Sequence, residues 1–352
     1  MDEHYAGIIN EISGSKQISL SQLEYILTNE VSSNDEYLFE TARAVAAEYF
    51  DRQVYLRGLI EFTNYCKNDC YYCGIRCSNS NADRYRLSEE EILSCCDLGD
   101  RLGFKTFVLQ GGEDPYFTDD ILCRIIERIR SEHPSCAITL SIGEKSYESY
   151  KSFYEAGADR YLLRHETANE EHYNRLHPGA MSPENRKRCL YELKEIGFQV
   201  GCGIMVGSPY QTIRHIYDDL IFMQELKPHM IGIGPFIAHK DTPFKTEPDG
   251  DVRRTLLLLS VIRLLFPKVL LPATTALGTA DVMGREKGIL AGANVLMPNL
   301  SPVNVRGKYL LYDGKICTGE EAAECNMCLR RRVERIGYRV TDGRGDHPDF
   351  AS

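Results

Sequence analysis

The sequence has no excess of positive charge and no long uncharged apolar run. Lys and Arg number 41 against 51 Asp and Glu, so the net charge is −10. A protein that coats nucleic-acid phosphates needs the opposite balance, so we expect no nucleic-acid partner. The most apolar run, residues 256–266, is interrupted by Arg263 and falls short of a membrane span. The acidic start lacks the layout of a signal peptide, so we expect a cytoplasmic protein with no membrane partner.

Cysteine, by contrast, is frequent, with 13 in 352 residues. Seven of them form two clusters, Cys66, Cys70, Cys73 and Cys77, and then Cys317, Cys325 and Cys328. In a large chain without an export signal, such clusters indicate metal sites or buried thiols rather than disulfides.

Apolar periodicity predicts helices through the first 50 residues and then a repeating pattern. Short strand-like runs occur at 59–62, 105–109, 137–142, 159–163, 200–206, 230–235, 269–275 and 294–298. Helix-like segments lie between them at 88–102, 119–132, 183–196, 212–226 and 251–265, and Ser88 with Glu91 predicts a capping box. Eight such units predict an α/β fold, a (β/α)8 TIM-type barrel.

We expect three regions in the chain. Residues 1–54 would form an N-terminal helical extension, 55–303 the barrel, and 304–352 a C-terminal accessory segment. Chemistry in such a barrel belongs at the C-terminal ends of the strands. The first cysteine cluster, the turn at 111–113 and the polar residues at 164 and 166 all follow predicted strands.

The first cluster has the spacing C-x3-C-x2-C over Cys66, Cys70 and Cys73, with Tyr72 before the third cysteine. Three thiolates can hold a [4Fe–4S] cube and leave one iron free to chelate S-adenosylmethionine (SAM). This spacing resembles the signature of the radical-SAM superfamily. The alternative is that Cys77 adds a fourth thiolate and closes the site around zinc or a fully ligated cluster.

Two further motifs suit a SAM site. Gly111 and Gly112 allow close approach of the backbone to a ligand, and Glu113 can accept a hydrogen bond from the SAM ammonium group. Arg164 and Glu166 are two apart on a predicted strand and so share a face. Glu166 could there bind the ribose hydroxyls or amino group of SAM, and the alternative is a structural ion pair inside the barrel.

The second cluster, Cys317-x7-Cys325-x2-Cys328, follows the last predicted strand. Three cysteines could hold a second [2Fe–2S] or [4Fe–4S] cluster with a non-cysteine fourth ligand. A zinc site or unligated thiols are the alternatives.

From residue 55 to residue 328 the sequence resembles the HydE family of [FeFe]-hydrogenase maturases, relatives of biotin synthase and methylornithine synthase. The resemblance rests on long strings such as IEFTNYCKNDCYYCGIR, VLQGGEDP, AGADRYLLRHETAN, IGIGPFIAHKDTP and PATTALGT. It implies a complete barrel whose strand ends hold the cluster and SAM above a closed cavity.

The resemblance also implies roles for individual residues. Cys66, Cys70 and Cys73 match the cluster ligands. The matches to SAM contacts are Ser141, Glu166 and Arg186, with Tyr72, Met205, Gly111, Gly112 and Glu113 beside them. The matches to cavity-facing residues are Gln110, Arg164, Thr274 and Thr275. Cys317, Cys325 and Cys328 match an accessory cluster that only some members keep.

In function, the resemblance implies a radical enzyme that reductively cleaves SAM to a 5′-deoxyadenosyl radical during assembly of the hydrogenase H-cluster. Its substrate would be a cysteine-bound iron–carbonyl–cyanide unit from a partner maturase, with a flavodoxin or ferredoxin as electron donor. One alternative is a biotin-synthase-like enzyme acting on a small organic molecule, as methylornithine synthase does. Another is a non-catalytic iron–sulfur electron carrier or scaffold.

Overall fold

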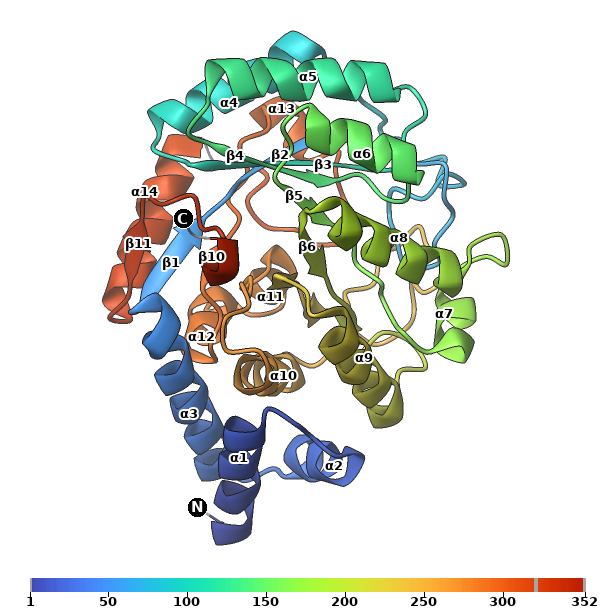
Figure 1. Cartoon of the computed structure of the whole chain (residues 1–352). Helices are drawn as coiled ribbons and strands as arrows, with labels where there is room; N and C mark the ends of the chain where they lie inside the picture. Colours follow the sequence, from blue (N-terminus) through green and yellow to red (C-terminus); the bar gives the residue numbers. More distant parts are fainter. Residues whose placement is uncertain (1, 320–321, 351–352) are drawn as a thin grey trace.

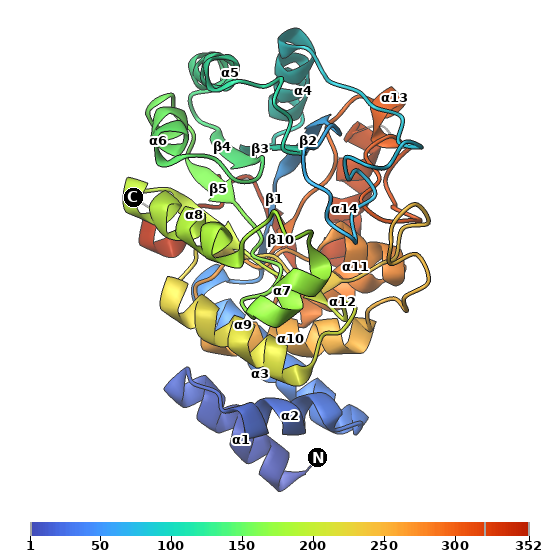
Figure 2. The ribbon, with the colours of Figure 1, turned by 90° about the vertical axis from the view of Figure 1, so that its right-hand side faces the viewer.

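The first 50 residues form three helices, as the periodicity predicts. In the computed structural model, which describes residues 2–319 and 322–350 apart from the side chains of 322–325, these are α1 (Glu3–Ser15), α2 (Leu20–Thr28) and α3 (Ser32–Phe50). Asp2 caps α1, and a Ser19–Gln22 capping box starts α2. These helices pack on one side of the molecule against the helices that surround the barrel (Figure 2).

The central element is a ring of parallel strands (Figure 1). Strands β2 (Gly58–Thr63), β3 (Thr106–Gly111), β4 (Ala137–Ser141), β5 (Arg160–Leu162), β6 (Gln199–Cys202) and β8 (Met230–Ile231) form one sheet in chain order. Single parallel bridges continue it from Met230 to Leu270, from Pro272 to Val295 in β10 (Val295–Leu296), and from Asn299 back to Leu59. The predicted eight-membered barrel is therefore confirmed.

Three of the predicted strands differ in detail. The runs at 200–206 and 230–235 each divide, giving the additional short pair β7 (Met205–Val206) and β9 (Gly234–Pro235). The break falls where the backbones touch, because a Cβ on Gly203 would lie 1.9 Å from the carbonyl oxygen of Gly232.

The run at 269–275 is not a continuous strand. Pro272 has no N–H to donate to a neighbouring strand. Thr274 is the N-cap of α11 (Thr275–Ala280), so the last residues of the run 269–275 begin a helix. The prediction that this run is a strand was therefore wrong for Thr274 and Thr275.

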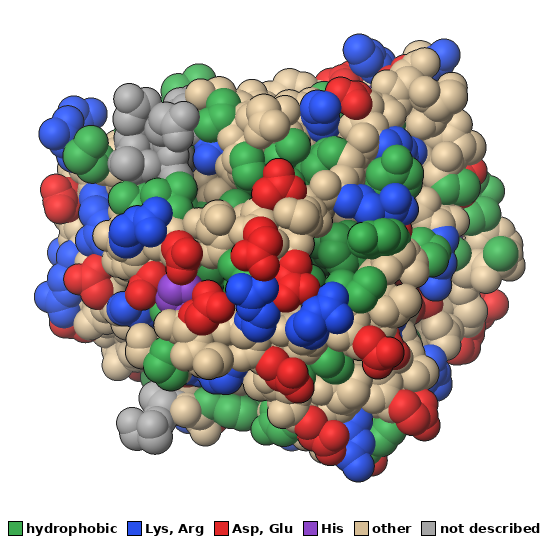
Figure 3. Space-filling view, turned by 90° about the horizontal axis from the view of Figure 1, so that it is seen from above, with side chains coloured by type: hydrophobic (Ala, Val, Ile, Leu, Met, Phe, Trp, Pro, Cys, Tyr) green, Lys and Arg blue, Asp and Glu red, His purple; other side chains and the backbone are tan. Residues whose placement is uncertain are grey.

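The outer layer consists of helices where the sequence predicts them, namely α4 (Glu89–Arg101), α5 (Asp119–Glu132), α8 (Pro183–Ile196), α9 (Ile213–Leu226) and α10 (Val252–Leu265). The capping box of Ser88 and Glu91 is present. Further helices are α6 (Tyr147–Glu155), α7 (Glu170–Leu176), α12 (Gly284–Leu290) and α13 (Val303–Arg306). Viewed over α4, α5 and α6, the surface carries acidic and basic side chains side by side (Figure 3). No described helix is both long and apolar enough to cross a membrane.

The C-terminal segment returns to the N-terminal end of the barrel. After α14 (Ala322–Arg335), β11 (Arg339–Thr341) pairs with β1 (Gln53–Leu56), and a 3-10 turn (Pro348–Phe350) follows. Buried Arg160 donates to the carbonyl of Arg344 at 2.9 Å and to Asp346 at 2.6 Å. The segment therefore closes this end of the barrel.

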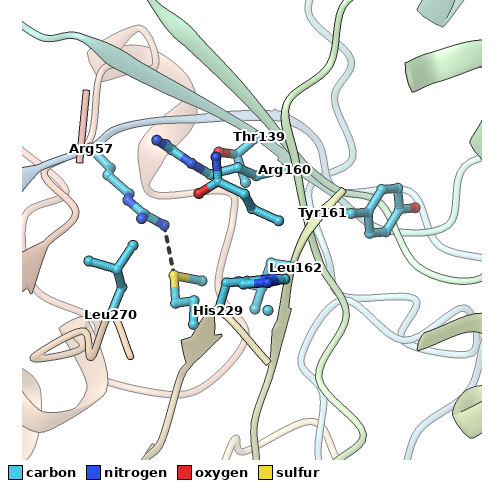
Figure 4. Close-up of a pocket in the computed structure, with 10 residues that line it drawn as sticks. Arg57, Thr139, Arg160, Tyr161, Leu162, His229 and Leu270 are labelled. Atoms are coloured by element: carbon cyan, nitrogen blue, oxygen red, sulfur yellow. Dashed lines mark hydrogen bonds between the residues drawn. The ribbon is translucent and has the colours of Figure 1, made fainter. Parts of the chain in front are cut away.

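A small cavity of about 10 Å³ lies beside this C-terminal segment. Arg57, Thr139 and Arg160 are among the residues that line it (Figure 4). Arg57 donates to the sulfur of Met230 at 2.7 Å and to the carbonyl of Gly345 at 3.2 Å. A space of this size holds about one water molecule. It is closed off by buried side chains, so the larger cavity at the opposite end of the barrel is the candidate active site.

Candidate active site

A cavity of about 320 Å³ lies at the C-terminal ends of the strands. The structure brings every predicted barrel-site residue to its wall. They are Cys66, Cys70, Tyr72, Cys73, Gln110, Gly111, Gly112, Glu113, Ser141, Arg164, Glu166, Arg186, Met205, Thr274 and Thr275. The volume lies in the range of small-molecule sites.

The three cysteines of the C-x3-C-x2-C motif lie on the loop that follows β2. The loop is tied to the barrel by hydrogen bonds from Lys67 N to the carbonyl of Glu113 and from Gly74 N to that of Leu311, both 2.9 Å. Burial raises the pKa of the Cys70 thiol to about 12, and burial raises the pKa of Cys66 as well. Thiols of this kind are protonated until a metal displaces the proton.

The spacing of these thiols does not suit one zinc ion. Thiolates that share a zinc ion lie about 3.8 Å apart, given Zn–S bonds of about 2.3 Å. Among the residues that the structure describes, no three thiols of this loop lie within 4.8 Å of one another. Three thiols on one short loop that line the same cavity are the donor set of an iron–sulfur cube, so the residues present fit that group.

Cys77 lies apart from the other three thiols. Its side chain is exposed and is not part of the cavity wall. The loop turns away between Cys73 and Cys77, where Arg76 donates two hydrogen bonds to Asp69 and Ser78 donates a third. The Cys77 N–H donates to the carbonyl of Asn68 at 2.9 Å, so the segment stays beside the loop although Cys77 does not line the cavity.

The turn after β3 packs directly against the cysteine loop. A Cβ on Gly112 would lie 2.2 Å from the carbonyl oxygen of Tyr65 and 2.7 Å from Cβ of Cys66. Only glycine fits that position. The carboxylate of Glu113, 9% exposed, accepts from Glu144 N at 3.0 Å and lies 3.2 Å from Nζ of Lys67. The turn therefore holds a buried acid beside the first cysteine.

Arg164 and Glu166 share the cavity wall. Nη2 of Arg164 lies 3.1 Å from Oε2 of Glu166, but neither atom is aligned for a hydrogen bond, and Nε of Arg164 also has no partner. The backbone of Glu166 has φ of 64°, a left-handed conformation that costs about 1–3 kcal/mol in a non-glycine residue. The ion pair named above as the alternative is therefore present, and its buried atoms Nη2 and Oε2, like Nε of Arg164, have no hydrogen-bond partner.

His165, which lies between Arg164 and Glu166 in the sequence, points away from the cavity toward α9. Its Nε2 lies 3.6 Å from Oδ1 of Asp219 on α9, and both side chains are fully buried. Desolvation raises the pKa of Asp219. The prediction that residues 164 and 166 lie two apart on a strand was wrong, because β5 ends at Leu162 and Glu166 has a left-handed backbone. Both side chains nevertheless line the cavity, while His165 packs against α9.

The remaining predicted contacts come from neighbouring elements. Arg186 on α8 donates to Glu144 at 2.5 Å and to the carbonyl of Arg164 at 2.8 Å. Tyr72 Oη lies 3.1 Å from Nε2 of His177, whose pKa burial lowers to about 3, so the ring is neutral. Ser141 at the end of β4 and Met205 at the start of β7 complete this part of the wall.

Sequence reasoning missed the residues that close the cavity. Lys315 donates to Glu61 at 2.5 Å and to the carbonyl of Tyr309 at 2.8 Å, and Gln110 donates to the Tyr309 hydroxyl at 3.4 Å. Tyr312 lines the same side. These residues, apart from Glu61 and Gln110, belong to the segment that follows the barrel. The one available signal was a charged residue, Glu61, in the middle of a buried strand, which indicates a side chain facing the barrel interior.

Cys317 and Cys328, the two described thiols of the second cysteine cluster, do not line this cavity. Arg285 donates to the sulfur of Cys317 at 3.5 Å, and Cys328 on α14 is exposed. Cys325 lies in α14, but its side chain falls outside the described residues. The geometry of the three thiols is therefore not defined, and the second cluster stays a prediction.

Comparison with known proteins gives a family and several relatives. Residues 60–223 match the model of the Radical SAM superfamily. The chain is 45% identical to the [FeFe] hydrogenase maturase subunit HydE of Thermotoga maritima, over 89% of this chain and 90% of that protein. It is 31% identical to the 3-methylornithine synthase of Methanosarcina acetivorans, over 80% and 79%. A crystal structure of methylornithine synthase superposes with a TM-score of 0.83 at 28% identity, covering 95% and 97%.

Proposed function

Because the chain belongs to the radical SAM superfamily and is a radical SAM enzyme of the HydE type, we propose that it acts in assembly of the [FeFe]-hydrogenase H-cluster. The observation that carries the proposal is the 45% identity to HydE along nine-tenths of both chains. The cavity supports it, because all the barrel residues matched to that family line one cavity.

We infer that Cys66, Cys70 and Cys73 hold the [4Fe–4S] cluster. When bound, the reduced cluster supplies the electron that cleaves SAM, which is the source of radical chemistry in this superfamily. The raised pKa of Cys70 implies that loading the cluster releases protons from the loop. Cys77 is exposed and does not line the cavity, which supports an iron left without a protein ligand.

The neighbouring residues would bind and orient SAM. Glu113, held by Lys67 and by Glu144 N, presents a fixed carboxylate to an ammonium group. Glu166 lies on the same wall, where its carboxylate could accept from hydroxyl donors, and Arg186 on that wall is held by Glu144. Gly111, Gly112, Ser141, Tyr72 and Met205 shape the remaining surface.

The substrate would lie deeper, against Gln110, Arg164, Thr274 and Thr275. The guanidinium group of Arg164 on this wall suits an anionic group, as an iron–carbonyl–cyanide unit would present. Lys315 and Glu61 close the space and exclude water, which protects a reactive species from side reactions. We propose residues 55–303 as the catalytic unit and 1–54 and 304–352 as its flanking extensions.

The accessory cluster and the partners complete the proposal. Cys317, Cys325 and Cys328 would hold a second iron–sulfur cluster outside the SAM site. A partner maturase would supply the organometallic substrate, and a flavodoxin or ferredoxin would supply electrons. Exclusion of Cys317 and Cys328 from the cavity wall supports an accessory role.

Anaerobic co-expression tests this function. The hydrogenase and the other maturases are expressed with this chain, with its Cys70→Ala variant, or without it. We expect hydrogenase activity only with the unaltered chain. Activity that is equal in all three would contradict the proposal.

A second candidate is a methylornithine-type reaction on a small organic substrate. It is favoured by the TM-score of 0.83 to methylornithine synthase. The same strains separate the two functions, because formation of 3-methylornithine without hydrogenase activation would favour this candidate.

A further inference from the structure

A separate group of metal-ligating side chains lies outside the barrel, where the ends of α4 and α5 meet. Asp97 lies near the end of α4, and Glu132 and His133 end α5. One oxygen from each carboxylate and one ring nitrogen of His133 lie within 4.8 Å of one another. The two helices are neighbours on the outer surface (Figure 1). The proposed maturation function uses none of these residues.

The histidine is the only buried member of this group, at 7% exposure, and its two nitrogens have different surroundings. Nδ1 lies 3.4 Å from Oδ2 of Asp100 and can donate to it. Nε2 lies 3.1 Å from Oδ1 of Asp97 but makes no hydrogen bond. With the proton on Nδ1, Nε2 carries a lone pair that is available to a metal ion.

This geometry matches a metal ligand better than a hydrogen bond. Two ligand atoms bound to one zinc ion at about 2.0–2.2 Å lie about 3–3.5 Å from each other. Metal-binding histidines almost always donate their other N–H to a carboxylate or carbonyl, and Asp100 occupies that place. The buried Nε2, which makes no hydrogen bond, is therefore available as a ligand beside the acids.

The electrostatics of the helix ends favour a cation here. Asp97, Asp100 and Glu132 all lie near helix C-termini, where the helix dipole disfavours negative charge. Asp100 has Lys105 at 2.8 Å, and Glu132 has Arg128 at 3.5 Å. Among the described residues, Asp97 forms an ion pair only with His133. The surrounding basic side chains therefore do not fully neutralise the negative charge of the acids at the C-terminal ends of α4 and α5.

We propose that Asp97, Glu132 and His133 form a binding site for a divalent transition metal ion of the zinc class. The mixed nitrogen and oxygen ligands favour zinc over magnesium or calcium, and Zn²⁺ binds such sites more tightly than Fe²⁺. Glu132 is exposed, so water can complete the coordination shell. The ion would join the ends of α4 and α5, and Asp100 is a positioning residue that orients His133.

The test uses the full, cluster-loaded enzyme, dialysed anaerobically against zinc chloride. Metal content is measured by mass spectrometry, and Tm is measured with and without zinc. Asp97→Asn and Glu132→Gln remove ligands at exposed or half-exposed positions and should fold normally. Asp120→Asn, an exposed change at the opposite end of α5, is the matched control.

We expect the unaltered enzyme and the control to retain one more zinc ion per chain than Asp97→Asn or Glu132→Gln. Zinc should raise the Tm of the unaltered enzyme and of the Asp120→Asn control, but not the Tm of Asp97→Asn or Glu132→Gln. Asp100→Asn should weaken zinc binding by about 10- to 100-fold. The iron content reports how much iron–sulfur cluster is bound and should be equal in all variants. A difference in zinc content between variants then does not come from zinc bound to the cluster cysteines. Equal zinc content in all variants would overturn the proposal, as would a fall in the Tm of Asp97→Asn that is the same with and without zinc.

Discussion

Replacement of Glu61 by glutamine tests the ion pair that closes the cavity. The carboxylate lies 2.5 Å from Nζ of Lys315, and the two side chains are 2% and 7% exposed. Glutamine keeps the shape but removes the charge, so the Lys315 ammonium stays buried with the carbonyl of Tyr309 as its other partner at 2.8 Å. Removing one partner of a buried ion pair costs about 3–5 kcal/mol.

This cost converts into a measurable shift of Tm. An unfolding entropy of about 2.1 cal/mol/K per residue gives about 0.7 kcal/mol/K for a chain of 352 residues. We therefore expect the Tm of cluster-loaded Glu61→Gln, measured by anaerobic calorimetry, to fall by about 4–7 °C. Glu40→Gln is the matched control, because Glu40 is 63% exposed in a surface pair with Arg43, and its Tm should change by less than about 1 °C.

The double variant Glu61→Gln/Lys315→Met separates charge from shape. It removes both charges and should recover most of the lost stability, because no uncompensated ion stays buried. A single variant within about 1 °C of the unaltered enzyme would refute the reasoning, and so would a double variant as unstable as the single one.

Three further predictions concern the cluster, the turn and acid stability. Cys70→Ala should abolish SAM cleavage, measured as 5′-deoxyadenosine, whereas Cys325→Ala should retain it; equal loss in both would show that the second cluster is not accessory. Gly112→Ala should reduce the iron bound per chain, because its Cβ would lie 2.2 Å from the Tyr65 carbonyl oxygen, and normal iron content would contradict that crowding. Burial lowers the pKa of His172 to about 4, so the unfolded chain binds a proton near pH 6.5 that the folded chain does not. Stability should fall as pH drops from about 6.5 toward 4, by on the order of 3 kcal/mol from this group, and less in His172→Asn; parallel pH profiles of Tm would exclude this contribution.

Much of the barrel follows from local patterns in the sequence. Apolar periodicity and capping residues are local signals, so helices such as α5 (Asp119–Glu132) and α8 (Pro183–Ile196) begin and end where the pattern predicts. The inward direction of Arg164 and Glu166, by contrast, is not explained by strand alternation, because both residues follow the end of β5 and Glu166 has a left-handed backbone. The C-x3-C-x2-C motif is a local signal as well, because its three cysteines lie within eight residues of the sequence.

Long-range contacts account for what could not be predicted. Lys315 lies 254 positions from Glu61, and no local pattern indicates that the chain after the barrel returns across the cavity. The break of two strands depends on Gly203 meeting Gly232 from a neighbouring strand. The C-terminal segment, whose Asp346 accepts a hydrogen bond from Arg160, likewise comes from a distant part of the chain. Each of these features depends on tertiary structure that periodicity does not encode.

The central claim is that three cysteines of the cavity bind a cluster with one iron open to SAM. Electron paramagnetic resonance of the dithionite-reduced, anaerobically reconstituted enzyme tests it directly when spectra are recorded before and after addition of SAM. The account predicts a reduced [4Fe–4S] signal that changes on adding SAM and persists in a Cys77→Ala variant. A signal that SAM does not alter, or that is lost with Cys77, would contradict it.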